Sequence, residues 1–199
     1  MGWMASWIAV QRAGKSEILQ HLGLAELGEE VLPGTRAAPF CCREFPDGWL
    51  VIFSENFDWA SPKRLLDLSR LGFAIACQFE DKVEMTSALT AARDGVELWR
   101  VFHDNTQSIF RLDVSGEPPA ALAAIRDKAF EEQRANGGED SSTDFVQDVP
   151  LELGRVVCGF HAEEVDAPFT ALRKASASGI GGEGKRRGLL GKLLSLGRG

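Results

Sequence analysis

A histidine and an aspartate stand next to each other in the segment ELWRVFHDNTQSIFRLDV, as His103 and Asp104. A histidine held by a carboxylate is the arrangement that general acid–base and nucleophilic catalysis use. Neighbouring residues of a strand point to opposite faces, so these two side chains cannot pair with each other. A catalytic role for His103 would therefore need an acid from elsewhere, and the loop residues Asp58 and Glu55 are the candidates.

The same segment is typical of a β-hairpin. If the chain turns at Asn105 and Thr106, the expected strand pairs are Trp99 with Leu112, Val101 with Phe110, and His103 with Ser108. This register gathers the apolar side chains on one face, and a slip by one residue would scatter them. We therefore expect His103 to be structural, at the edge of a core and hydrogen-bonded to backbone, with Asp104 on the other face or in the turn.

The loop SENFDWASP leads from an apolar strand into a helix and carries Glu55, Phe57, Asp58 and Trp59. Acidic and aromatic side chains on a connecting loop are suited to binding, because tryptophan contributes a large contact area at little entropic cost. These four residues, with His103, are the candidate binding residues. The alternative is that Phe57 and Trp59 pack under the loop as core.

Two other patterns favour no cofactor. AVQRAGKS resembles a phosphate-binding loop, with Lys15 and Ser16 at its end, but it begins inside an apolar strand and no later strand ends in a suitable magnesium ligand. The three histidines and four cysteines show no metal-ligand spacing. We expect no catalytic residue, no metal and no cofactor from these motifs, and four reduced, buried thiols.

The charge of the chain is unevenly distributed. The net charge is -7, but residues 174–199 carry six Lys or Arg against Glu183, which leaves -12 on residues 1–173. Nucleic-acid binding needs Lys and Arg on a face of the fold, so an acidic body argues against it. An acidic body is suited to a basic protein partner.

The apolar pattern predicts a single α+β domain over residues 1–173. Short apolar strands, such as SWIAVQ, WLVIF and FAIACQF, alternate with punctuated helices in the order βαββαβ, followed by three more strands and two helices. The segment SPKRLLDLSRLG is such a helix, which Ser61 caps and Pro62 begins. The first six elements have the ferredoxin-like order. We expect a mostly antiparallel sheet with the helices packed on one face.

Residues 174–199 have a different composition from the domain. They are rich in glycine, basic residues and leucine, so we expect a disordered tail capable of transient but not stable membrane contact. The N-terminus shows no signal peptide, and no apolar run is long enough to span a bilayer. These features predict a cytoplasmic protein.

Several short motifs carry a resemblance to a known family: WIAV, LGL, PDGW, LWRVFHD, GEPP and DVPLEL. Through them, residues 3 to about 169 resemble a family of uncharacterised bacterial cytoplasmic proteins of similar length. The resemblance implies a bacterial origin and no established activity, and it supplies no catalytic residues.

Two functions remain in view from the sequence. The first is a non-enzymatic, protein-binding domain, one version of which is an immunity-type protein that neutralises a toxin. The alternative is a small-molecule-binding protein or hydrolase-like enzyme that uses His103 with a loop carboxylate. The sequence leaves homo-oligomerisation open.

Overall fold

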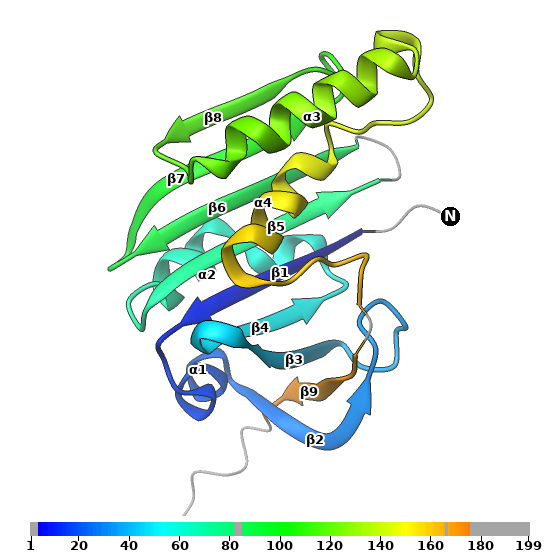
Figure 1. Ribbon diagram of the computed structural model, residues 1–199. Coiled ribbons are helices and arrows are strands. Elements are labelled where there is room, and N and C mark those ends of the chain that lie inside the picture. The colour runs from blue at the N-terminus through cyan, green and yellow to red at the C-terminus, as the bar shows by residue number, and fades with distance from the viewer. Residues whose placement is uncertain (1–3, 82–84, 166, 176–199) are drawn as a thin grey trace, which may run out of the picture.

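The computed structural model describes residues 4–81, 85–165 and 167–175 (Figure 1). Within these residues one antiparallel sheet of nine strands is formed, in the order β2-β9-β3-β4-β1-β5-β6-β7-β8. The strands are β1 (Met4–Gln11), β2 (Leu24–Val31), β3 (Phe40–Phe45), β4 (Trp49–Ser54), β5 (Phe73–Glu80), β6 (Thr86–Arg93), β7 (Val96–Asp104), β8 (Leu112–Gly116) and β9 (Phe169–Lys174). The expected α+β class with a mostly antiparallel sheet is confirmed.

Four α-helices are described: α1 (Lys15–Leu22), α2 (Pro62–Leu68), α3 (Ala121–Ala135) and α4 (Asp148–Cys158). Short 3₁₀ turns lie at Pro46–Gly48, Phe57–Ala60 and Gly138–Asp140. Ser61 caps α2 with its hydroxyl and Pro62 begins it, as the sequence predicts. Of the predicted disordered tail, residues 174–199, Lys174 is the last residue of β9, and residues 176–199 lie outside the described residues.

The helices cover both faces of the sheet, so the expectation of helices on one face is wrong. Alternate residues of the central strand β1 enter two separate cores, with Trp7 in one and Ile8 in the other. Helices α3 and α4 close the Trp7 core, and α1 and α2 close the Ile8 core (Figure 1). The physical reason is the uninterrupted apolar runs of β1 and β4, which are buried on both sides and need cover on both sides.

Two strands were missed by the sequence pattern. β2 follows α1 directly and interrupts the expected βαββαβ order, and β9 lies between β2 and β3. β2 is the edge of the sheet and is exposed over most of its length, so its sequence LAELGEEV shows little apolar alternation. β9 is short, and its partners come from distant parts of the chain.

The hairpin of β7 and β8 has a different register from the expected one. Its pairs are Trp99 with Gly116, Val101 with Val114, and His103 with Leu112. The connection is longer than a tight turn because Asp104 accepts hydrogen bonds from Thr106, and Glu139 accepts from the Ser108 hydroxyl and the Ile109 N–H. Glu139 comes from a separate loop, so a local pattern could not have predicted this register.

Helix α4 lies unusually close to the sheet at a glycine. A Cβ on Gly154 would stand 2.8 Å from Trp7 Cζ2 and 2.9 Å from Trp7 Cη2. Trp7 is almost fully buried in β1 and meets Phe160 edge-to-face at 5.3 Å between ring centroids. The missing side chain of Gly154 therefore sets the depth at which α4 packs on the sheet.

We expect Gly154→Ala to lower the free energy of unfolding by about 1–3 kcal/mol, because the new methyl group overpacks this contact. The better helix propensity of alanine offsets only part of that loss. Trp7→Phe removes the two atoms that clash, so the double variant should lose less than the sum of the single variants. Urea unfolding of the four proteins measures this coupling, and strict additivity would contradict the contact.

Candidate functional site

His103 lies in β7 on the face covered by α3 and α4, and its side chain is fully buried. Its Nε2 is 2.8 Å from Asp144 Oδ2, and its Nδ1 is 2.7 Å from the carbonyl oxygen of Arg111. The Arg111 carbonyl accepts from Nδ1, and Nε2 is hydrogen-bonded to the Asp144 carboxyl group. The Asp144 side chain is equally buried, so each of the two groups is the buried polar partner of the other.

Asp144 also organises the chain just before α4. Its Oδ1 accepts hydrogen bonds from the N–H groups of Val146 and Gln147, at 3.0 Å each. Gln147 in turn donates from its side chain to the Glu80 carbonyl, and its own carbonyl accepts from the Ser87 hydroxyl. The start of α4 is thus tied to β5, β6 and β7 through buried polar groups.

The candidate loop residues lie apart from His103. Trp59 is buried in the core on the α1–α2 face, tilted against Phe40 and covered by Arg64, and Phe57 is half-buried. Glu55 accepts a hydrogen bond from the Arg36 N–H at 2.7 Å, and Asp58 is exposed. The structure therefore brings neither loop carboxylate to His103, whose acid partner is Asp144 from the loop 136–147.

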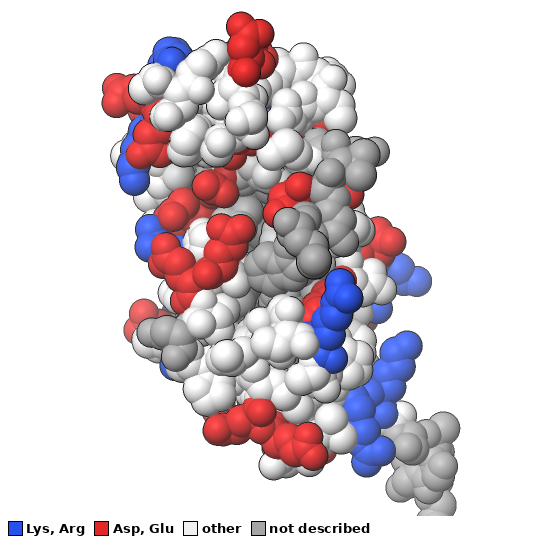
Figure 2. Space-filling model, turned by 90° about the vertical axis from the view of Figure 1, so that its right-hand side faces the viewer, with Lys and Arg blue, Asp and Glu red and all other residues white. Residues whose placement is uncertain are grey.

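A groove runs between α3 and α4, with a volume of about 550 Å³. Its apolar lining residues are Ala124, Ile125, Ala129, Phe145, Val149 and Val156. Its charged lining residues are Lys128, Glu132, Asp148, Glu152 and Arg155. Acidic side chains predominate on this side of the molecule, at the left of Figure 2, with a few Lys and Arg at the outer margin. The groove therefore combines an apolar floor with a rim of three acidic and two basic side chains, in which Lys128 pairs with Glu132 and Arg155 with Glu152.

Asp148 is the unusual carboxylate of this groove. Desolvation by the groove walls and the nearby charges of Glu163, Glu152, Asp144 and Glu132 together raise the pKa of Asp148 to about 7. Asp148 is nevertheless exposed to solvent at the rim of the groove. Among the described residues no group donates a hydrogen bond to its carboxylate, whereas Glu152 is paired with Arg155. Asp148 thus offers an uncompensated acceptor to a cationic group.

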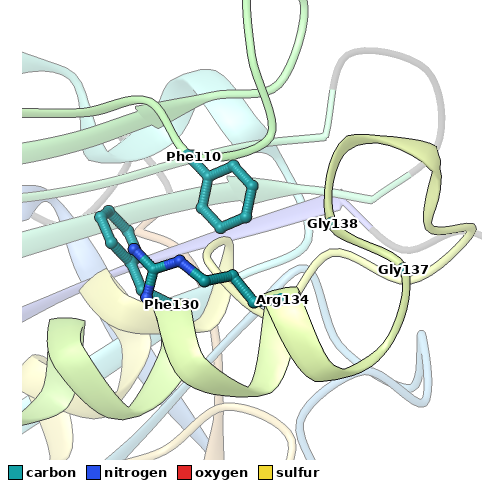
Figure 3. Close-up of a pocket in the computed structure, with 5 residues that line it drawn as sticks. All are labelled: Phe110, Phe130, Arg134, Gly137 and Gly138. Atoms are coloured by element: carbon teal, nitrogen blue, oxygen red, sulfur yellow. The ribbon is translucent and has the colours of Figure 1, made fainter.

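A second hollow, of about 440 Å³, lies at the end of α3 (Figure 3). There the Arg134 guanidinium stacks against Phe110 and Phe130, at 5.6 and 5.8 Å from the ring centroids, and the two rings meet edge-to-face. Arg134 also lies in the last turn of α3, where a cation suits the free carbonyls. We assign this cluster to the anchoring of the β7–β8 connection on α3.

The remaining reactive side chains are structurally engaged. All four cysteines are free and buried, and burial raises the pKa of Cys41 and Cys158 to about 12 and of Cys42 to about 11. Lys15 forms an ion pair with Glu26. No cluster of His, Cys, Asp or Glu suited to a metal ion occurs within the described part of the chain.

Comparison with protein-family models, curated proteins and solved structures finds no match to this chain. Among the described residues, every helix is too short or too polar to cross a bilayer. The groove and the buried His103–Asp144 pair were both missed by the sequence pattern. The Asp144–Gln147 segment preceding the strongly amphipathic helix DVPLELGRVVC was the available signal for a helix start.

We expect His103→Ala to lower the free energy of unfolding by about 3–5 kcal/mol, because it leaves the buried Asp144 carboxyl group without its partner. Asp104→Asn should cost less than about 1 kcal/mol, because this carboxylate lies beside solvent and mainly holds its own turn. Asp144→Asn keeps the acceptor for Val146 and Gln147 and should fall between the two. Urea unfolding measures all three, and a loss below about 1 kcal/mol for His103→Ala would refute this role.

Proposed function

We propose that this protein is a non-enzymatic binding domain whose α3–α4 groove holds a basic, partly apolar segment of a protein partner. The observation that carries the proposal is the uncompensated Asp148 carboxylate on the rim of an apolar groove. Amphipathic segments bind such grooves by placing apolar anchors on the floor, while their polar face meets the rim. A lysine or arginine of the partner would supply the counter-charge that Asp148 lacks.

The charge of the whole domain supports the same class of partner. Residues 1–173 carry a net charge of -12, which accelerates the approach of a basic protein and disfavours nucleic acid. An immunity-type protein that neutralises a basic toxin is one concrete version of this function. The exposed Val156, 56% accessible on the groove wall, is suited to a contact that a partner would bury.

The arrangement of His103 gives the enzymatic alternative little support. Both ring nitrogens are engaged by Asp144 and Arg111, and the side chain is fully buried. A catalytic base must reach the proton that it removes. Glu55, Phe57, Asp58 and Trp59 stay candidates for a separate contact surface, with Asp58 and Trp59 lining a hollow beside the end of β9.

The setting of the protein is also a proposal. We place it in the bacterial cytoplasm, supported by four free, buried cysteines.

We further infer that β1, α1, β3, β4, α2 and β5 form a ferredoxin-like unit into which β2 is inserted. The sheet order β3-β4-β1-β5 and the common face of α1 and α2 support this inference.

The binding proposal is tested with a fluorescent peptide of leucine and lysine in an amphipathic pattern, and with the same peptide carrying glutamate in place of lysine. Wild-type protein should bind only the basic peptide. Glu132→Gln combined with Asp148→Asn should weaken binding at least about tenfold, because two rim charges are lost. Glu29→Gln combined with Glu30→Gln removes the same charge from exposed positions of β2 and should change little. Equal losses in both pairs of variants would contradict a binding site in the groove.

The same titration should depend on pH through Asp148. In the free protein this group has a pKa of about 7, and a bound cation favours its ionised form, so binding releases a proton. The affinity should therefore rise about tenfold between pH 6 and pH 8. Asp148→Asn should abolish most of this rise, and an unchanged pH profile in that variant would show that Asp148 does not meet the cation.

A further inference from the structure

The chain contains a segment of the composition that the groove favours. Residues 185–198 read KRRGLLGKLLSLGR, with five basic residues, five leucines and no acid. Residues 175–184 connect this segment to the end of β9. The described part of the chain carries the acidic groove, and the segment carries the basic and apolar side chains that fit it.

We infer that residues 185–198 are an internal ligand of the α3–α4 groove, which a partner must displace. The inference rests on the proposed function of the groove. Its leucines would cover the apolar floor at Ile125 and Val149, and its basic residues would meet Asp148 and Glu132. This segment can contact both the apolar floor and the acidic residues of the rim, whereas a purely basic or purely apolar segment would contact only one of them favourably.

The connection is long enough for this placement. Helix α4 packs on β5, β6 and β7, and β9 is the second strand of the sheet. Five strand spacings separate β9 from β6, which is about 24 Å at ~4.8 Å per spacing. Residues 175–184 can span at most about 33–36 Å when fully extended. The chain leaves β9 beside the end of α1, on the opposite face of the sheet, so the connection must also pass round the strand ends. A nearly extended connection therefore reaches the near part of the groove of its own molecule.

Tethering makes even a weak contact effective. A short connection gives the attached segment an effective concentration on the order of 1 mM. If the free segment bound with a Kd of about 0.1 mM, the groove would be occupied about nine-tenths of the time, and an added ligand would bind about tenfold more weakly. Only a partner that binds the groove more tightly than the tethered segment would then displace it.

The test uses full-length protein and a fluorescent synthetic peptide with the sequence of residues 185–198. The tail variant replaces Leu189, Leu190, Leu193 and Leu194 with asparagine, which keeps the basic charges. We expect this variant to bind the added peptide about tenfold more tightly than wild type, because its own segment no longer competes. Ser176→Asn, in the connection, is the matched control and should behave as wild type. Equal affinity of the wild type and the tail variant would overturn the inference.

Two further readouts identify where and how the segment binds. Amide hydrogen exchange in α3 and α4 should be slower in wild type than in the tail variant, and the difference should not change with protein concentration. A difference that grows with concentration, together with dimers in sedimentation, would overturn docking within one molecule. If the leucine–lysine peptide binds through Asp148 but the tail variant matches wild type, only the internal ligand is refuted. If neither peptide binds either protein, the groove itself is refuted.

Discussion

The buried pair of His103 and Asp144 is the contact on which the α3–α4 face depends. It places two ionisable groups in the interior, where each is tolerated only while the other is present. Because Asp144 also accepts from the first N–H groups before α4, the pair couples β7 to the beginning of that helix. Moving α4 along the sheet would break all of these hydrogen bonds together. The pair therefore fixes the position of α4 along the strands.

Other contacts fix the depth of α4 on the sheet and the position of its neighbour α3. Its depth is set by Gly154 on Trp7, and its neighbour α3 is held through Gln133, which is fully buried and bridges Gly138, Thr143 and Phe145. These contacts leave α3 and α4 close at their packed side and parted above it, with Asp148 and Glu132 on facing walls. The groove is thus a consequence of buried polar and steric constraints beneath it.

Elements with strong local signals could be predicted from the sequence. The strand register and the side-chain partners that depend on residues distant in the chain could not. The capped helix α2, the apolar strands β1, β4 and β5, and the burial of His103 follow from spacing and turn residues. The β7–β8 register depends on Glu139, and the partner of His103 lies 41 residues further along the chain, so neither could be read locally. The groove was missed because Glu132 and Asp148 lie on separate helices. The two-sided burial of β1 was readable from WIAV, which is too apolar for a strand with one wet face.

The ionisation of Asp148 links the stability of the fold to the proposed binding in the groove. A carboxyl group whose pKa is raised in the folded state contributes stability at low pH, which is lost as pH rises through about 7. At neutral pH its ionised form is therefore disfavoured in the fold, beside four other carboxylates that repel it. Its place in the first turn of α4 offsets part of this cost, because the helix dipole favours a negative charge there. Sites that lower stability in this way are expected where a ligand supplies the missing counter-charge, which supports the proposed binding of a cationic group in the groove.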